Sequence, residues 1–341
     1  MTLRAKPRDN PRILDLSRTV ARGAGRIPTG IDRAELAYLQ EMLNRGDLVF
    51  GLIRTRLGFL LLDRSGLSGI AAAVRDSSGL GELDRLSKLT RRRDPARAQM
   101  ETHARKLAIG RSTPARLGAL LEQHLPAGVE YMNVGHSNLT PRMFRALSRV
   151  SASKSTVLLH DLLPLTHPQF CRPESEDKAT RMLQVVSRYA DRVVHTTSST
   201  CSSNKTYLAK AGRCPPGIVA PLGVGRPRTT CLRSPSFQDP YFIAIGTLEP
   251  RKNIGFLLDL WEAIDQSSEA ELPTLVIAGA RGWEYPAFFT RLTGHTLFEN
   301  KIHWIDAADD DQVTALLSGA RGLLFPSHAE GLGLPPLEAA R

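Results

Sequence analysis

The chain alternates short apolar runs of strand length with longer amphipathic segments of helical length. In the first half, segments with apolar residues at helical spacing are Asp32–Leu43, Met182–Ala190 and Ser202–Lys210. The strand-length runs between them are Ile13–Leu16, Leu48–Ile53, Leu57–Leu62, Val129–Asn133, Val157–His160 and Arg192–Thr196. Such alternation predicts an α/β fold, in which helices cover the faces of a sheet.

A second series of the same kind follows residues 223–240, which are rich in Gly, Pro, Arg and Ser. We expect helices over Ile254–Ile264 and Asp311–Leu317, and a third that begins near Leu337. The expected strands are Tyr241–Ile245, Leu275–Ala278, Lys301–Ile305 and Gly322–Phe325. Strands that are apolar throughout are typical of a parallel sheet buried on both faces.

The two series predict two Rossmann-like domains, residues 1–225 and 241–341, joined by a linker at 226–240. The second series covers only about 100 residues and ends just after a helix has begun at Leu337. We therefore expect a second domain that is incomplete and lacks its C-terminal helices.

Composition excludes several classes of protein. No apolar run approaches the roughly 18 residues of a membrane helix, and the polar N-terminus lacks the core of a signal peptide. These features predict a cytoplasmic protein. The four cysteines form no CxxC pair, which favours free thiols over a zinc site or a disulfide framework.

The net charge of +11 fits an anionic lipid surface or phosphorylated substrates, although a general excess of arginine would produce the same value. The densest charged stretch, Arg75–Arg116, has the pattern of a helical surface. No aromatic residues are interleaved with its arginines, so we expect no nucleic-acid partner.

Two loops of the second half carry residues suited to an anionic ligand. Arg251 and Lys252 follow the strand Tyr241–Ile245 and precede a helix, an arrangement that suits a phosphate. The alternative is a helix start with two solvated cations. After the next strand, Gly279-Ala-Arg-Gly282 would let a ligand approach the backbone.

The string Pro326–Glu338 is the most specific segment. Gly331 and Gly333 free the backbone to turn its N–H groups toward an anion, and a helix N-terminus follows. Glu330 and Glu338, eight positions apart, can accept hydrogen bonds from sugar hydroxyls. The alternative is a glycine turn followed by a capping glutamate.

This string resembles the E-x7-E signature of retaining glycosyltransferases of family 4, which have the GT-B fold with two Rossmann-like domains facing a cleft. Four further segments resemble motifs of the same family: Gly246–Asn253, His160–Pro164, Pro28–Arg33 and Val219–Val224. The resemblance thus extends across both halves of the chain, whereas Arg75–Arg116 has no counterpart.

The resemblance implies a role for each matching residue. Arg251 and Lys252 would neutralise the diphosphate leaving group, Glu330 would contact the donor sugar and Glu338 the ribose. Gly30 would let its loop approach the diphosphate, and His160 would lie near the transferred sugar. Backbone N–H groups would come from Gly331, Leu332, Gly333 and Leu334.

Two further groups of residues have alternative interpretations. His136, at the end of another strand, and Asp161 are candidates for the acceptor, although a structural histidine is as good an interpretation of His136. The acidic run Asp306–Asp311 precedes a helix, so capping explains it better than metal binding. We expect neither a metal nor another cofactor.

The implied reaction moves a hexose from a nucleoside-diphosphate sugar to an acceptor hydroxyl with retention, in the assembly of a surface polysaccharide or glycolipid. GDP-mannose is the expected donor, and a glycan or lipid-linked molecule the expected acceptor. A peripheral position on the inner face of an anionic membrane is compatible with the charge.

Two alternatives stay open. A fragment or paralogue without activity could bind nucleotide sugar or act as a scaffold. A nicotinamide oxidoreductase would require a G-x-G-x-x-G turn after the first strand, and Gly23, Gly25 and Gly30 have the wrong spacing for it.

Overall fold

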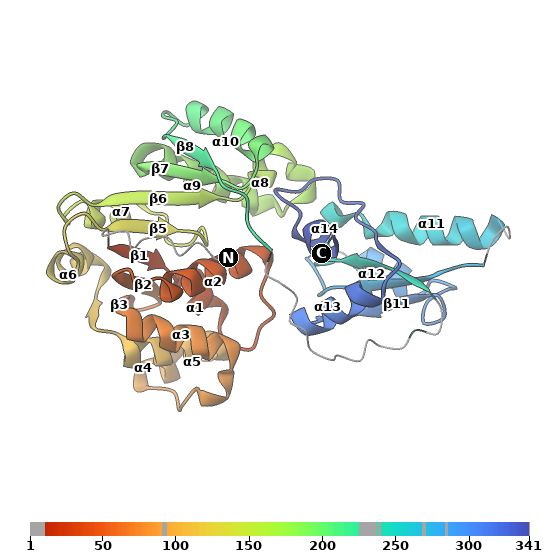
Figure 1. Cartoon of the computed structure of the whole chain (residues 1–341), viewed down its shortest axis with the longest axis horizontal. Helices are drawn as coiled ribbons and strands as arrows, with labels where there is room; N and C mark the ends of the chain where they lie inside the picture. Colours follow the sequence, from red (N-terminus) through yellow and green to blue (C-terminus); the bar gives the residue numbers. More distant parts are fainter. Residues whose placement is uncertain are drawn as a thin grey trace. The chain divides into compact units, whose positions relative to one another are not determined.

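The computed structural model describes residues 11–90, 94–224, 237, 240–267, 271–283 and 286–340 (Figure 1). The chain divides into two compact units. The first comprises Met1–Asp161 and Thr180–Pro221, and the second Leu162–Ala179 and Leu222–Arg341. Most of the expected linker, 226–240, lies outside the described residues.

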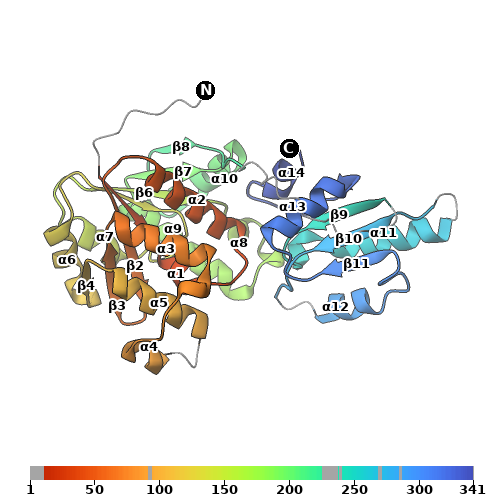
Figure 2. The same ribbon diagram turned by 60° about the horizontal axis from the view of Figure 1, so that its bottom comes forward.

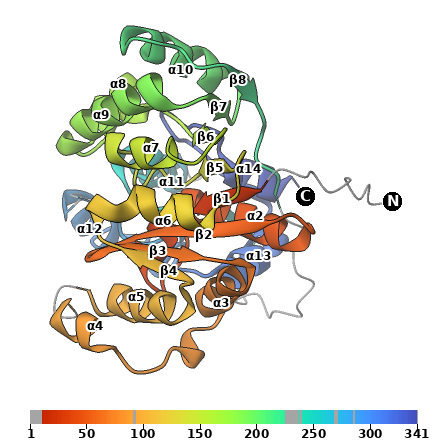
Figure 3. The same ribbon diagram turned by 90° about the vertical axis from the view of Figure 1, so that its left-hand side faces the viewer.

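The first unit contains one eight-stranded sheet with the order β4-β3-β2-β1-β5-β6-β7-β8, which Figure 3 shows from β8 at the top to β4 at the bottom. All six predicted strands of this half are present, with ends shifted by a few residues. The strands are β1 Arg12–Asp15, β2 Val49–Thr55, β3 Gly58–Leu62, β4 Gly110–Ser112, β5 Glu130–Asn133, β6 Lys154–Leu159, β7 Arg192–His195 and β8 Gly217–Val219.

One strand, β3, runs against the direction of the others and breaks the parallel pattern of a Rossmann-like sheet. β3 pairs antiparallel with β2, and β4 pairs antiparallel with β3, whereas the other neighbours are parallel. Only Arg56 and Leu57 separate β2 from β3, and a connection this short can form only a hairpin. The apolar run therefore predicted the strand but not its direction.

Four helices of this part of the chain were not predicted, namely Ser17–Arg22, Arg64–Arg75, Leu117–His124 and Pro141–Leu147, and the first of them replaces part of the expected glycine-rich loop. α2 begins at Gly30, two residues before its expected start. The helices are α1 Ser17–Arg22, α2 Gly30–Asn44, α3 Arg64–Arg75, α4 Arg85–Thr90, α5 Pro95–Leu107, α6 Leu117–His124, α7 Pro141–Leu147, α9 Pro173–Tyr189 and α10 Ser198–Lys210, with short 3-10 turns η1 Ser77–Gly79 and η2 Pro114–Arg116.

Helices cover both faces of this sheet. Ile13, Leu52 and Leu61, from three adjacent strands, form one cluster with residues of α6 and α7. On the other face, a Cβ on Gly51 would lie only 2.6 Å from Leu67 of α3. β2 lies on one side of β1 and β5 on the other, so the strand order reverses at β1. The carboxyl ends of β1 and β5 therefore flank the topological switch point of the sheet.

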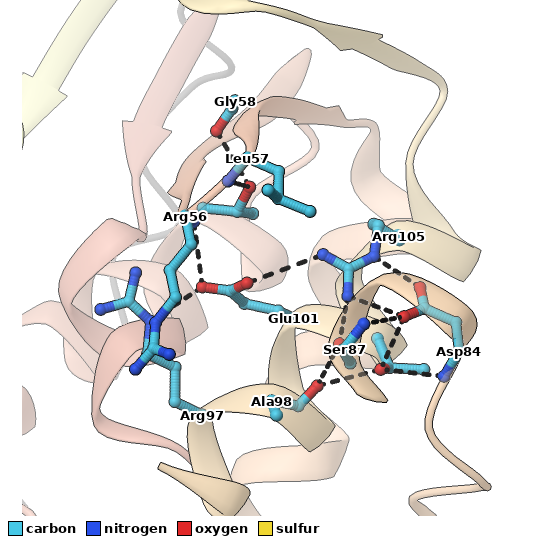
Figure 4. Close-up of polar contacts among 11 residues, drawn as sticks. Arg56, Leu57, Gly58, Asp84, Ser87, Arg97, Ala98, Glu101 and Arg105 are labelled. Carbon is cyan, nitrogen blue, oxygen red and sulfur yellow. Dashed lines mark hydrogen bonds and ion pairs between the residues drawn. The ribbon is translucent and has the colours of Figure 1, made fainter. Parts of the chain in front are cut away.

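The stretch Arg75–Arg116 is not simply a charged helical surface, and that prediction was wrong for its central residues. Glu101 and Arg105 of α5 are only 2% and 4% exposed. Arg105 lies 2.6 Å from Asp84 and 3.6 Å from Glu101, and the backbone N–H of Arg56 donates to Glu101 (Figure 4). Glu101 thus ties α5 to the β2–β3 hairpin, and Arg105 ties α5 to Asp84 in front of α4. Buried charges require such partners.

The second unit contains a four-stranded parallel sheet with the order β11-β10-β9-β12. Its strands confirm the predicted series, although β12 is shorter than expected; they are β9 Tyr241–Ile245, β10 Thr274–Ala278, β11 Ile302–Ile305 and β12 Gly322–Leu323. The remaining helices are α8 Leu163–Thr166, α11 Ile254–Ser267, α12 Pro286–Thr293, α13 Asp310–Gly319 and α14 Leu334–Ala339, with 3-10 turns η3 Pro168–Phe170 and η4 Pro250–Lys252; α8 and α12 were not predicted.

Alternate residues of the second sheet pack into two separate clusters. Leu275 and Ile277 of β10 contact residues of α11 and α12, whereas Val276 and Ala278 lie in a cluster with Leu316 of α13. α12 and α13 accordingly lie on opposite sides of the sheet (Figure 2). This arrangement confirms a parallel sheet that is buried on both faces.

In the described part of the chain, no helix is long and apolar enough to cross a membrane. Cys201 is a buried thiol and Cys214 an exposed one, and Cys171 is partly buried. Cys231 lies outside the described residues.

Candidate functional site

Two candidate loops of the second unit leave adjacent strands and meet at the same edge of the sheet. β12 pairs with β9, and the N–H of Leu324 donates to the carbonyl of Ile243 at 2.7 Å. The loop after β9 therefore runs beside the loop after β12. The N–H of His328 donates to the carbonyl of Arg251 at 2.9 Å and joins the two loops directly.

A cluster of two cations and two carboxylates forms where these loops meet. The Glu330 carboxylate lies 2.5 Å from Lys252 Nζ and 2.7 Å from an Arg251 guanidinium nitrogen. Arg251 also pairs with Glu249 at 2.6 Å and donates to the carbonyl of Ala329 at 2.9 Å. The structure thus brings together three of the predicted donor-site residues.

Burial and charge act in opposite directions on this cluster. Burial raises the pKa of Glu330, but Lys252 and Arg251 together outweigh it and hold that pKa below its usual value. Burial lowers the pKa of Lys252, and the attraction of Glu330 offsets the shift only in part. Lys252 is 8% exposed and lies 4.8 Å from the ring centre of Phe325, so its buried ammonium group requires an anionic partner, which is Glu330 in this structure.

Glycines allow the backbone to approach closely at this edge. Gly246 is left-handed, with φ of +141°, and a Cβ there would lie 3.0 Å from Lys252 Cε. A Cβ on Gly279 would lie 1.9 Å from the carbonyl oxygen of Gly246. The loop Gly279–Gly282 predicted from sequence therefore has a packing role against the loop after β9.

The glycine string after Glu330 leads into α14 as predicted. Gly333 is left-handed, with φ of +74°, and is the N-cap of α14, and proline occupies the first turn of that helix. Gly331, Leu332 and Leu334 are partly exposed, and so is Glu338 within α14. Their predicted contacts with a donor stay predictions.

The remaining candidates lie in the first unit. Gly30 is exposed at the first position of α2, after the N-cap residue Thr29. Asp32 accepts hydrogen bonds from the Thr29 backbone and hydroxyl at 2.8 and 2.7 Å, and it pairs with Arg18 at 2.6 Å. These contacts fix the start of α2, whose N–H groups suit an anion.

His136 and His160 lie together at the carboxyl ends of β5 and β6. Their ring centres are 5.0 Å apart, and the rings meet edge to face. The Nε2 of His136 lies 2.7 Å from the carbonyl of Leu158, and the Nε2 of His160 lies 2.8 Å from the carbonyl of Val134. Because a carbonyl only accepts, each Nε2 carries the proton.

Both imidazoles of this pair are neutral at physiological pH. Burial lowers the pKa of His160, and burial, with His160 nearby, lowers the pKa of His136 to about 3. The pair therefore suits hydroxyl groups better than a phosphate. Asp161 follows His160 directly and is partly exposed.

Sequence reasoning missed a set of buried polar residues beside this pair. Asp15, Glu35 and Tyr131 are each at most 2% exposed. A signal for Glu35 was present, because Glu35, Leu39 and Met42 follow a helical spacing and form the buried face of α2. The helix Asp32–Leu43 was predicted from its apolar residues, and Glu35 is not one of them.

The acidic run Asp306–Asp311 caps a helix, as expected. Asp309 accepts from the N–H of Gln312 at 2.7 Å, and Gln312 accepts from the N–H of Asp309 at 2.9 Å. Within the residues described, no group of three or more metal-binding side chains occurs.

Comparison with known proteins adds to this geometry. Residues 234–341 match the family model described as Glycosyl transferases group 1. The serotype-specific mannosyltransferase WbdA of Escherichia coli is 26% identical over 209 residues, which cover 57% of this chain and 25% of WbdA. The O-antigen chain mannosyltransferase B of Escherichia coli is 30% identical over 166 residues, or 48% of this chain and 39% of that protein.

A solved structure resembles almost the whole chain. The alpha,alpha-trehalose 6-phosphate synthase from Burkholderia multivorans matches with a TM-score of 0.55 at 12% identity, over 97% of this chain and 79% of that one. This likeness shows the fold alone, which is the α/β GT-B fold.

Proposed function

We propose, from the premise that residues 234–341 form a glycosyl transferases group 1 domain, that the protein transfers a hexose from a nucleoside-diphosphate sugar to an acceptor hydroxyl. The observation that carries the proposal is the position of Glu330. Its carboxylate contacts both Arg251 and Lys252, and the glycine string begins at the next residue. One edge of the sheet thus offers cations for a diphosphate and a carboxylate for sugar hydroxyls.

The chemistry of the leaving group supports these roles. Breaking the bond between the anomeric carbon and the diphosphate leaves negative charge on a phosphate oxygen. Preorganised cations and backbone N–H groups stabilise such charge as it develops. Arg251 and Lys252 supply the cations, and Gly331 to Leu334 supply the N–H groups.

We infer retention of configuration by attack on the same face as the leaving group. The acceptor oxygen bonds to the anomeric carbon, the bond to the diphosphate breaks, and the acceptor proton passes to the departing phosphate oxygen. Asp15 and Glu35 are 2% and 0% exposed, so neither offers a carboxylate nucleophile in the first unit. His160, neutral and protonated on Nε2, would hold a sugar hydroxyl through Nδ1.

The donor and the setting follow from the relatives. Both curated relatives are named as mannosyltransferases, which supports GDP-mannose as the donor. The name of the second also supports an acceptor in O-antigen or similar surface polysaccharide. The net charge of +11 supports peripheral binding to the inner face of an anionic membrane.

Thermal-shift measurements with UDP-, GDP- and ADP-sugars test the donor site. GDP-mannose should stabilise the wild type, and Glu338→Ala should remove most of the shift. Glu262→Ala is the matched control, because Glu262 lies exposed on α11 of the same unit. The proposal is wrong if no nucleotide sugar stabilises the wild type.

Product analysis tests the reaction itself. NMR of the transferred sugar should show the anomeric configuration of the donor, and an inverted product would exclude attack on the leaving-group face. Donor binding without transfer to any mannose-containing acceptor would favour a binding or scaffold role.

A further inference from the structure

The loop between β5 and α7 has an unusual backbone. His136 and Asn138 are both left-handed, with φ of +58° and +60°, and neither is a glycine. Two such residues within three positions are uncommon, and each costs free energy that surrounding contacts must offset. The amide oxygen of Asn138 is also buried, with no hydrogen-bond partner in the described part of the chain.

Asp15, at the end of β1, holds this loop. Its carboxylate accepts from the Tyr131 hydroxyl at 2.8 Å, from the Asn138 amide at 2.9 Å and from the N–H of Ser17 at 2.9 Å. The Asn133 side chain extends the network, because its amide donates to the Tyr131 hydroxyl at 2.9 Å. Asp15 therefore fixes the loops after β1 and β5 to each other at the switch point.

Asn133 continues the network into the loop itself. Its amide also donates to the carbonyl of Ser137 at 2.7 Å, and its oxygen accepts from the N–H of His136 at 3.1 Å. Hydrogen bonds from the buried Asn133 side chain thus set the conformation of the loop.

Glu35 supports the same loop from α2. It is 0% exposed and accepts from the hydroxyl and the N–H of Thr19 at 2.8 and 3.2 Å. Its second oxygen has no partner among the described residues and lies against Gly135, where a Cβ would be only 1.8 Å away. Only glycine fits at 135 with Glu35 in this place.

The loop in turn determines how the two histidines are held. The carbonyl of Val134 accepts a hydrogen bond from His160 Nε2, and His136 Nε2 donates one to the carbonyl of Leu158 in β6. If the loop shifts, His160 loses the acceptor that fixes its tautomer, and His136 loses its orientation.

We propose that Asp15 and Glu35 are positioning residues, which hold the Val134–Asn138 loop so that His136 and His160 present Nδ1 as a hydrogen-bond acceptor for sugar hydroxyls. The assignment of hydroxyls as the ligand rests on the proposed function. The positioning itself rests only on contacts within the first unit. Neither carboxyl touches the reacting atoms.

Two variants of the full chain test this assignment. Gly135→Ala places a Cβ against Glu35, and Tyr131→Phe removes one oxygen from the network around Asp15. Gly46→Ala is the control, because its Cβ would meet no atom within 4 Å in the same unit. The first readout is the ¹⁵N NMR spectrum of ring-labelled histidine, assigned with His136→Asn and His160→Asn.

In the wild type and in Gly46→Ala, both rings should show a protonated Nε2 and an unprotonated Nδ1. In Gly135→Ala and Tyr131→Phe, the His160 signals should move toward the averaged values of a ring that exchanges tautomers. Transfer should fall roughly 10- to 100-fold in kcat, with the KM for the donor within about twofold, as expected from a misplaced group.

Unchanged histidine signals and kcat in folded Gly135→Ala and Tyr131→Phe would overturn the positioning role. If Gly135→Ala does not fold, as judged by near-ultraviolet circular dichroism, the milder Tyr131→Phe decides. If the wild type transfers no sugar, the proposed function fails, whereas the histidine spectra still decide whether the two carboxyls position the pair.

Discussion

At the scale of single residues, two glutamates of this chain have opposite surroundings. Glu330 lies between two cations, and these hold its pKa below the usual value against the effect of burial. Glu35 has no such pair of cations against it, and burial, with Asp15 nearby, raises its pKa to about 8. Glu330 is therefore ionised at neutral pH, and Glu35 is largely protonated there. Replacing each by glutamine should have different consequences.

Glu330→Gln should bind a nucleoside diphosphate more tightly but transfer sugar more slowly. The substitution removes the carboxylate that competes for Arg251 and Lys252, so Kd for GDP should fall roughly 3- to 10-fold. Without a nucleotide, the unpaired Lys252 should cost about 1–3 kcal/mol of stability. Calorimetric titration and urea unfolding measure both effects, with Glu262→Gln as the control. A weaker affinity for GDP would show that the two cations do not bind the diphosphate.

The same ion cluster predicts the acid response of the second unit. The pKa of Glu330 is lower in the folded state than its unfolded value of about 4.5. Above that value, the ionised carboxylate therefore makes its full contribution to the free energy of unfolding. That contribution is lost as pH falls through the lower, folded pKa. Urea unfolding between pH 6 and pH 3 should therefore show a steeper loss of stability in the wild type than in Glu330→Gln. An equal loss of stability with falling pH in the two proteins would contradict a lowered pKa of Glu330.

Glu35→Gln should stabilise the first unit increasingly as pH rises. The pKa of Glu35 is about 8 when folded and about 4.5 when unfolded, so the unfolded state loses its proton first. Stability of the wild type should fall by about 1.4 kcal/mol per pH unit between these values and level off above pH 8. Urea unfolding at pH 5, 6, 7 and 8 should show this slope disappear in Glu35→Gln but not in Glu41→Gln, an exposed position on the same helix. A slope that survives in Glu35→Gln would mean that another group titrates.

At the scale of the elements, the second sheet depends on the close approach of two loops. Gly279→Ala would place a Cβ 1.9 Å from the carbonyl oxygen of Gly246, and backbone cannot move as a side-chain end can. We expect a loss of about 1–3 kcal/mol in stability and a weaker affinity for the nucleotide. Gly322→Ala is the matched control in β12, since its Cβ would meet only Phe242 at 3.4 Å. Equal stability of the two variants would show that the loop can move apart.

The same elements show what an amino-acid pattern can predict. Apolar runs such as Leu57–Leu62 predicted strands, because burial on both faces selects such runs. They did not predict that β3 pairs antiparallel, because an apolar run carries no direction; only the short connection between Leu48–Ile53 and Leu57–Leu62 pointed to a hairpin. α1 was missed because Gly23 and Gly25 follow it closely, and the short helix has no periodic pattern of its own.

The candidate site divides in the same way. Arg251, Lys252 and Glu330 were predicted because they belong to contiguous motifs, and the structure brings them into contact. The network around Asp15 could not be predicted, because Asp15, Glu35 and Asn138 come from three separate segments that only the sheet topology brings together. A glutamate on an amphipathic helix, such as Glu35, is also predicted to lie on the surface unless its neighbours in the fold are known.

At the scale of the whole molecule, each unit has its own sheet and its own core, so each has the means to unfold separately. Scanning calorimetry of the full chain should therefore show two transitions. GDP has no hexose for His160 to hold, and Arg251 and Lys252 both lie in the second unit. At about 100 times its Kd, GDP should therefore stabilise the second unit alone by about 2.7 kcal/mol and raise the temperature of only one transition. Glu35→Gln at pH 8 should raise only the other, because Glu35 and Asp15 both lie in the first unit. A single transition that both the ligand and the substitution raise would show that the two units unfold as one, and the ligand-linked energy would then stabilise the histidine pair as well as the donor site.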